Sequence, residues 1–222
     1  MSCSEDDYDQ SLSDEGYMNN VWNWKNYVSW ALAFSIVVFV TAYGLNIAST
    51  PNLTEFGDDI VAPQAAARPL ALYLHIIFGP LALFVGMFQL LPRVRDKRML
   101  HRWLGRFYVL CCNISAFGGL WMAVNSVAGP IAQTGFATLA LAWFYTTNKA
   151  WLLARGGNYE AHRSMVLYSY ALTFAAVSLR VQLPFVFIYQ LDFLNYYTII
   201  AWSCWVPNLL FMYWWQNRVI QA

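Results

Sequence analysis

The sequence predicts an all-α protein of the polytopic membrane class, a helix bundle with about six transmembrane helices. Two observations lead to this class. Hydrophobic residues make up 59% of the 222 residues and charged residues only 11%, which is too apolar for a soluble domain whose surface meets water. The apolar residues also form long continuous runs that lack the alternation of a membrane β-barrel. We therefore expect an integral membrane protein whose first partner is the lipid bilayer.

Six runs have about the 20 residues that a helix needs to cross roughly 30 Å of hydrocarbon. They are 26–45, 70–91, 103–125, 134–153, 164–183 and 194–215. The second run contains Gly79-Pro80 and the sixth contains Pro207, which predict kinks or local openings. The boundary after the fifth run leaves two alternatives open. The helix ends near Pro184 and the next begins near Asp192, or a longer fifth helix is kinked at Pro184.

The positions of the lysines and arginines predict the orientation. With the N-terminus inside, eleven of the thirteen lie on or near the inner side, and only Arg68 and Arg180 lie toward the outer side. Cytoplasmic loops and helix ends retain basic residues. We expect both termini inside, in the plasma membrane or, for a bacterial host, the inner membrane.

The first 22 residues are acidic and polar and have no apolar face. They are expected to form a mobile cytoplasmic tail, followed by the transmembrane domain over 23–222. An acidic start before a full-length apolar run is not typical of a cleavable signal.

Three histidines stand out, because an ionisable residue within a membrane span is costly and therefore suggests function. His75 lies near the outer end of the second run, and His101 and His162 lie at the inner starts of the third and fifth runs. Helical spacing places His101, Gly105 and Tyr108 on one face. It likewise groups the side chains of His162, Met165 and Ser169.

One explanation of these histidines is topological, with His-Arg pairs serving only as interfacial anchors. In that case His75 and Arg180 would pair with a loop carboxylate such as Asp192, Glu55 or Asp58.

A second explanation is metal ligation, in which His101 and His162 bind the iron of a haem b from opposite sides. A helix N-terminus disfavours imidazolium and so favours the neutral ring that a metal needs. His75 with Met122 would be a second haem ligand pair. We favour this hypothesis, which predicts a membrane electron-transfer component with a redox partner.

A third explanation is anion binding at helix N-termini, where backbone N–H groups and the helix dipole favour negative charge. The predicted ligand is an anionic amphiphile, either a lipid headgroup or a carboxylate, that the protein binds or transports. A smaller site would surround His75. The candidate basic residues are Arg102, Arg106, Arg163, Arg180 and Lys149.

The chain shows no nucleophile elbow, phosphate-binding glycine loop or catalytic carboxylate pair, so the sequence leaves open whether it is an enzyme. We expect no nucleic-acid partner. A structural partner of another membrane protein is the remaining alternative.

The stretches "LHIIFGPLALFVGMFQLLP", "LHRWLGRFYVL" and "AHRSMVLYSYALTFAAVSLR" resemble a family of uncharacterised predicted integral membrane proteins, domain of unknown function 2306. The resemblance covers approximately residues 70–180. In helix number and buried histidines, the chain is also distantly similar to transmembrane two-haem cytochromes b. Those proteins generally use two histidine pairs, whereas this chain has three histidines in total.

Overall fold

The computed structural model describes residues 24–49 and 61–220, and every regular element in these two ranges is an α-helix. The helices are α2 (Trp24–Ser49), α3 (Val61–Ala67), α4 (Pro69–Gln89), α5 (Pro92–Asp96), α6 (Arg98–Ala123), α7 (Gly129–Arg155), α8 (Tyr159–Thr173), α9 (Ala175–Ile188), α10 (Phe193–Ser203) and α11 (Val206–Ile220). The predicted acidic tail lies outside the described residues. The prediction of an all-α fold is confirmed for the described part of the chain.

The chain divides into two units, residues 1–38 and 39–222, with the division inside α2. The first unit contributes only the beginning of α2 to the described residues. The second unit contains the rest of α2 and the helices α3 to α11, and everything that follows concerns this unit.

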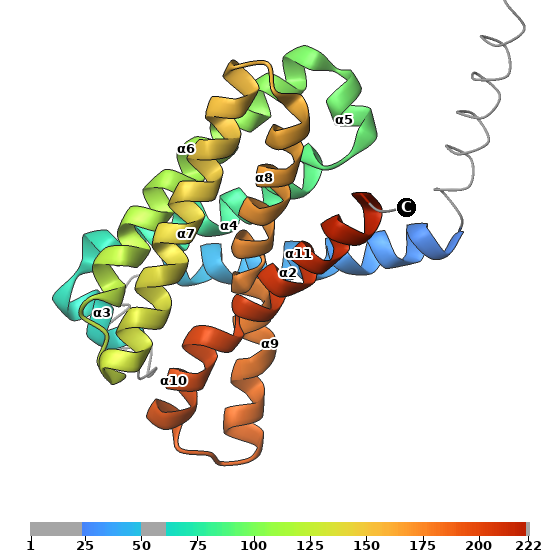
Figure 1. The fold of residues 1–222 in the computed structure, drawn as a ribbon. Helices are drawn as coiled ribbons and strands as arrows, with labels where there is room; N and C mark the ends of the chain where they lie inside the picture. Colours follow the sequence, from blue (N-terminus) through green and yellow to red (C-terminus); the bar gives the residue numbers. More distant parts are fainter. Residues whose placement is uncertain (1–23, 50–60, 221–222) are drawn as a thin grey trace, which may run out of the picture. The chain divides into compact units, whose positions relative to one another are not determined.

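The second unit is built around α4, α6, α7 and α8. Helix α4 packs against α6, α6 against α7, and α7 against α8, and these four helices run along one another in Figure 1. Buried side chains from several helices form the main core, among them Val85, Tyr108, Trp143, Leu172 and Cys204. Because α6, α7 and α8 follow one another through short connections, the start of α6, the end of α7 and the start of α8 lie at the same end of the bundle.

Two helices of the described residues are long and apolar enough to cross a membrane. They are Pro69–Gln89 and the combined segment Tyr159–Ile188. Helices α6 and α7 are longer still than α4, at 26 and 27 residues, but basic residues in α6 and the polar stretch Thr146–Lys149 in α7 reduce their apolar character. The six spans expected from the sequence therefore reduce to two that length and composition support.

The fifth predicted run is part of a longer helical segment. Helix α8 ends at Thr173 and α9 begins at Ala175, so the segment is interrupted at Phe174 and continues through Pro184. The end predicted near Pro184 is wrong, because α9 continues to Ile188. The alternative of a longer fifth helix is confirmed in its length, but the helical segment is interrupted at Phe174 and not at Pro184. The start predicted near Asp192 is confirmed, because the Asp192 carboxylate accepts a hydrogen bond from the Asn195 N–H at 2.9 Å and caps α10.

The two prolines singled out by the sequence behave differently. Helix α4 continues through Pro80 without a break. The sixth predicted run is divided between α10 and α11, with an interruption at Cys204-Trp205, immediately before Val206-Pro207. A proline lacks the N–H that would continue the preceding helical ladder, which accounts for a break on its N-terminal side.

Asn208 joins the two helix interruptions. Its side-chain amide donates to the carbonyl oxygen of Cys204 at 3.1 Å and to that of Ala171 at 3.3 Å. It also exchanges hydrogen bonds with the Ser178 hydroxyl, at 3.1 and 3.2 Å. One amide thus contacts backbone next to the α10–α11 break and next to the α8–α9 break.

Candidate functional site

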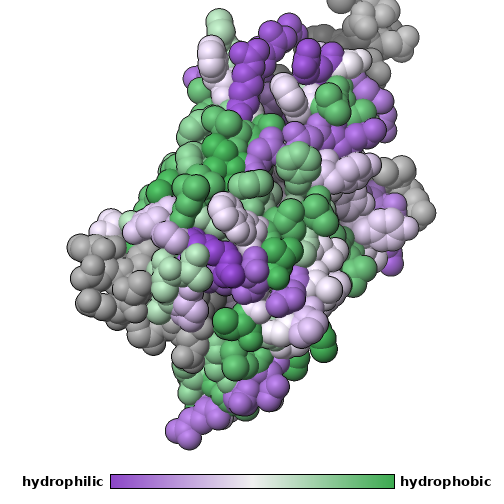
Figure 2. All heavy atoms as spheres, turned by 90° about the vertical axis from the view of Figure 1, so that its left-hand side faces the viewer, coloured by the Kyte–Doolittle hydropathy of each residue, from purple (hydrophilic) through white to green (hydrophobic). Residues whose placement is uncertain are grey.

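A cavity of about 660 Å³ lies at the end of the bundle where α5, the start of α6, the end of α7 and the start of α8 meet. We call it the arginine pocket. Five arginines and two histidines are among the residues that line it: Arg95, Arg98, Arg102, Arg106, Arg155, His101 and His162. Hydrophilic side chains gather at this end of the molecule, the upper end of the face shown in Figure 2.

The α7–α8 turn brings His162 into the pocket. Gly157 adopts a positive φ of 77°, a conformation that costs glycine little. The Asn158 side chain then caps α8 by accepting a hydrogen bond from the Ala161 N–H at 3.1 Å. The reversal places the His162 ring beside the end of α7, where its Nδ1 lies 2.8 Å from the Ala150 carbonyl oxygen.

This contact determines which nitrogen of His162 is available. A carbonyl oxygen only accepts, so Nδ1 carries the proton and Nε2 keeps its lone pair. The same arrangement orients histidines that ligate metals. Nε2 is therefore the atom of His162 that can accept a proton or bind a metal.

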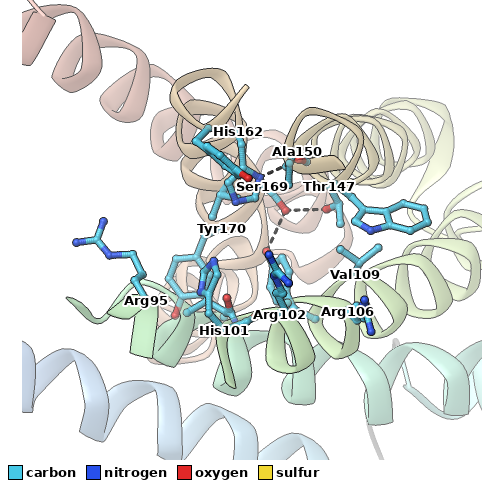
Figure 3. Close-up of a pocket in the computed structure, with 18 of the residues that line it drawn as sticks. Arg95, His101, Arg102, Arg106, Val109, Thr147, Ala150, His162, Ser169 and Tyr170 are labelled. Carbon is cyan, nitrogen blue, oxygen red and sulfur yellow. Dashed lines mark hydrogen bonds between the residues drawn. The ribbon is translucent and has the colours of Figure 1, made fainter. Parts of the chain in front are cut away.

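His101 enters the pocket from the opposite wall, on α6, as Figure 3 shows. Its Nδ1 is buried and makes no hydrogen bond. Burial lowers the pKa of His101, and the nearby His162 and Arg95 lower it further. The imidazole is thus neutral at pH 7 and is ready to gain a proton when a negative charge enters the pocket.

Two of the five arginines of the pocket lie over aromatic rings. The Arg106 guanidinium lies 5.2 Å from the centre of the Trp103 ring, and that of Arg155 lies 5.3 Å from the Trp151 ring. Among the described residues, no aspartate or glutamate lines the pocket. Because a ring face takes up none of the N–H donors, these donors remain available to a ligand.

The hydroxyl groups of Tyr108, Thr147 and Ser169 lie in the wall of the pocket, and their hydrogen bonds continue to Thr173 and Trp143, which do not line it. The Tyr108 hydroxyl lies 2.9 Å from the hydroxyls of both Ser169 and Thr173, and Ser169 lies 2.6 Å from the hydroxyl of Thr147. The Trp143 indole N–H donates to Thr173 at 2.9 Å. These buried groups satisfy one another, as Figure 3 shows for the part next to the pocket, and they make a rigid polar base below the charged rim.

Several of the residues proposed from the sequence lie together in the structure, and their roles stay predictions. His101, Arg102, Arg106 and His162 come together in the pocket, and the predicted face of His101, Gly105 and Tyr108 lines it as well. Two predicted anion-binding residues lie elsewhere. Arg163 and Lys149 are exposed and do not line the pocket, because their positions on α8 and α7 turn them away from it.

Three lining arginines were missed as site residues, namely Arg95, Arg98 and Arg155. A signal for them existed, since the sequence places all three at the inner helix ends. The sequence shows near which end of a helix a basic residue lies. The direction in which its side chain projects depends on how α5 and α7 pack against the other helices.

The other predicted residues lie in a second cavity of about 270 Å³, which we call the His75 cavity. His75, Met122 and Arg180 all line it. It is surrounded by the start of α4, the end of α6, the start of α7 and parts of α9 and α10, which places it toward the other end of the four-helix bundle from the arginine pocket.

Over the described residues, no group of three or more histidine, cysteine, aspartate or glutamate side chains is placed to hold a metal ion. The described cysteines, Cys111, Cys112 and Cys204, are buried and free. A multi-ligand protein metal centre is thus not formed by these residues, while a haem held by two histidines would need only His101 and His162.

Comparison with known proteins identifies the family. A family model described as "Predicted membrane protein (DUF2306)" matches residues 72–216. This range includes both histidine motifs and nearly all of α4, α6, α7 and α8. No curated protein and no solved structure matches the chain, and the resemblance to cytochromes b is not supported by any match. The chain belongs to the predicted membrane protein family DUF2306.

Proposed function

We propose that the protein binds an anionic amphiphile, with the charged head in the arginine pocket and the apolar part against the neighbouring hydrophobic helix surface. The observation that carries this proposal is the composition of the pocket wall, where the described residues include five arginines, two histidines and no carboxylate. Like charges held together without counter-ions repel one another, and a bound anion removes that repulsion.

The geometry favours an anion that is also partly apolar. Helices α6 and α8 begin at the pocket whereas α4 and α7 end there, so the helix dipoles offset one another and the arginines supply the positive charge. Val109, Val166 and Trp151 contribute apolar surface to the same wall. A phosphate or carboxylate head on a hydrocarbon chain matches both properties.

We further propose that the chain spans the membrane six times with the pocket at the cytoplasmic side. The family assignment and the two apolar helices support a membrane location. Nine basic residues occur between Arg93 and Arg163, all at the ends of α5, α6, α7 and α8 that surround the pocket: Arg93, Arg95, Lys97, Arg98, Arg102, Arg106, Lys149, Arg155 and Arg163. Basic residues concentrate on the cytoplasmic side of membrane proteins.

Binding of a soluble short-chain lipid tests the proposal. We expect dihexanoyl phosphatidate to bind the full-length protein in detergent, measured by calorimetry, and dihexanoyl phosphatidylcholine to bind far more weakly. Replacing Arg102 and Arg106 by glutamine should weaken phosphatidate binding by roughly 100-fold, since each charged hydrogen bond contributes about 1.5–3 kcal/mol. Added salt should also weaken binding.

Arg163→Gln is the matched control, because it removes one positive charge at the same end of the bundle from a side chain outside the pocket. Its affinity should stay within about twofold of the wild type, because Arg163, unlike the equally exposed Arg102 and Arg106, does not line the pocket. Equal binding of the two lipids, or an equal loss in Arg163→Gln, would show that the pocket is not the binding site.

A second candidate function is haem-b binding for electron transfer. It is favoured by one observation, that His101 and His162 line opposite walls of the same pocket, with Nε2 of His162 left available by the Ala150 contact. The pocket volume of about 660 Å³ falls in the usual range of ligand sites, and arginines would bind haem propionates. The haem would supply one-electron redox chemistry, and the chain would hold and orient it.

Absorption spectra distinguish the two candidates. Haem binding predicts a Soret band in protein purified from haem-supplied cells, with sharpened bands after dithionite reduction that are lost in both His101→Ala and His162→Ala. A colourless wild type that still binds phosphatidate would exclude the haem candidate and leave the first proposal intact.

A further inference from the structure

The His75 cavity contains a charge that no described carboxylate balances. Arg180 projects into it from α9, and none of the described residues that line its wall is an aspartate or glutamate. The Arg180 Nη1 donates to the Ala176 carbonyl oxygen at 3.0 Å, whereas the buried Nε has no hydrogen-bond partner. The guanidinium lies 5.8 Å from the centre of the Tyr43 ring. Removing such a cation from water costs several kcal/mol unless an anion approaches it.

His75 offers a second polar atom to the same cavity. Its Nδ1 lies 3.0 Å from the Ser115 carbonyl oxygen, so Nδ1 carries the proton and Nε2 is the acceptor. The Ser115 hydroxyl donates to the His75 carbonyl oxygen at 3.3 Å and lies 3.1 Å from Nδ1. The histidine is thus fixed in one orientation by the adjacent helix.

Two glycines leave room for this pair. A Cβ added at Gly119 would lie 3.0 Å from His75 Nδ1, and one added at Gly79 would lie 3.0 Å from the Ser115 hydroxyl. Both distances are at the lower limit of real contacts. Any larger residue would displace the histidine or the serine that holds it.

The rest of the cavity wall is mainly apolar, with side chains such as Leu72, Phe136 and Leu139. The cavity volume is about 270 Å³. At roughly 30 Å³ for each group the size of a water molecule, this volume holds on the order of nine such groups. The cavity therefore suits a compact molecule rather than a full lipid or a haem.

From this arrangement we infer that the His75 cavity is a second binding site, selective for a small monocarboxylate that has an apolar body and a hydroxyl group. The carboxylate pairs with Arg180, and the hydroxyl donates to Nε2 of His75. One guanidinium balances one negative charge, so a monoanion is matched better than a dianionic phosphate. The site is separate from the arginine pocket and does not depend on the function proposed there.

Three related probes test the two contacts separately. These are 4-hydroxybenzoate, benzoate, which lacks the hydroxyl, and methyl 4-hydroxybenzoate, which lacks the charge. Calorimetry on the full chain in detergent should give the tightest binding for 4-hydroxybenzoate. We expect at least tenfold weaker binding for the ester and several-fold weaker binding for benzoate.

Two variants assign the preferences to residues. Arg180→Met should abolish the preference for the acid over the ester, and Arg180→Lys should restore part of it. His75→Leu should abolish only the preference for the hydroxylated acid over benzoate. The Arg102→Gln/Arg106→Gln variant is expected to bind 4-hydroxybenzoate like the wild type, which separates this site from the arginine pocket.

Melting temperatures show whether each variant is folded. A wild type that binds acid and ester equally would overturn the inference, since a carboxylate of the chain itself would then satisfy Arg180. Unchanged discrimination in folded Arg180→Met would also overturn it. Loss of 4-hydroxybenzoate binding in the Arg102→Gln/Arg106→Gln variant would instead assign the probe to the arginine pocket.

Discussion

The arginine pocket and the His75 cavity use positive charge in opposite ways. Five arginines line the pocket near the ends of the helices, and two of them lie over aromatic rings. The cavity uses the single guanidinium of Arg180, held among apolar side chains. The first region therefore brings several positive charges together, whereas the second sets a single charge among mainly apolar side chains, where a lower dielectric constant strengthens an interaction between charges.

The two regions also differ in how closely α6 packs against its neighbours. A substitution that tests this difference has the largest expected effect on the free energy of unfolding. A Cβ at Gly118 would lie 2.6 Å from the Ala71 carbonyl oxygen, whereas one at Gly105 would lie 3.7 Å from the nearest atom, Oε1 of Gln89. Gly118→Ala should therefore push α4 and α6 apart and lower the free energy of unfolding by about 3 kcal/mol.

Gly105→Ala is the control for that substitution. It adds the same methyl group to the same helix in ordinary contact distance, and alanine favours the helix by up to about 1 kcal/mol. Denaturant titration in mixed micelles measures both variants. Equal losses of stability would show that the two ends of α6 are packed alike.

The isolated charge of Arg180 predicts a gain in stability when it is removed. Arg180→Met keeps much of the side-chain length and should raise the free energy of unfolding by about 2 kcal/mol in the absence of carboxylate ligands, because an unbalanced buried cation is lost. Arg106→Met, at the exposed rim of the other site, should change it by less than about 0.5 kcal/mol. A destabilised Arg180→Met protein would mean that the cation already has a counter-charge within the chain.

The Tyr108 hydroxyl belongs to the base of the arginine pocket. Tyr108→Phe leaves the Ser169 and Thr173 hydroxyls without one of their partners and should lower the free energy of unfolding by about 1.5 kcal/mol. Tyr145→Phe removes a hydroxyl from an exposed side chain and should have almost no effect. A similar small change in both variants would indicate that water replaces the lost hydroxyl in the pocket.

The smallest expected effect is a pH dependence of anion binding to the arginine pocket. The free pKa of His101 lies below its ordinary value of about 6.5, and a bound anion raises it. The complex therefore binds a proton more readily than the free protein. Affinity for dihexanoyl phosphatidate should increase by roughly threefold as the pH falls from the pKa of His101 in the complex toward its pKa in the free protein. His101→Gln should remove this increase, and an unchanged slope would assign the titration to another group.

Much of this arrangement follows from local sequence patterns. Long apolar runs predict the helices, and the shared level of His101 and His162 follows from their position at two helix starts. The face shared by His101, Gly105 and Tyr108 follows from the helical period. These features depend on neighbours a few residues apart.

The features that the sequence did not predict depend on tertiary packing. Nothing in the residues around Phe174 marks a helix break, whereas Pro184, the expected break, stays within α9. Arg155 reaches the pocket while nearby Lys149 does not, a difference set by the direction in which each side chain leaves α7. Such directions are decided by contacts between helices far apart in sequence.

The hydrogen bonds of the Asn208 side chain bear on how a helix can be interrupted where water cannot reach its backbone. At the surface of a soluble protein, solvent would satisfy the carbonyl groups exposed by a break, but the hydrocarbon of a membrane offers no such donor. Asn208 supplies hydrogen bonds to the carbonyls of Ala171 and Cys204 at both breaks. The chain thus carries an internal substitute for water at two helix interruptions that are far apart in sequence.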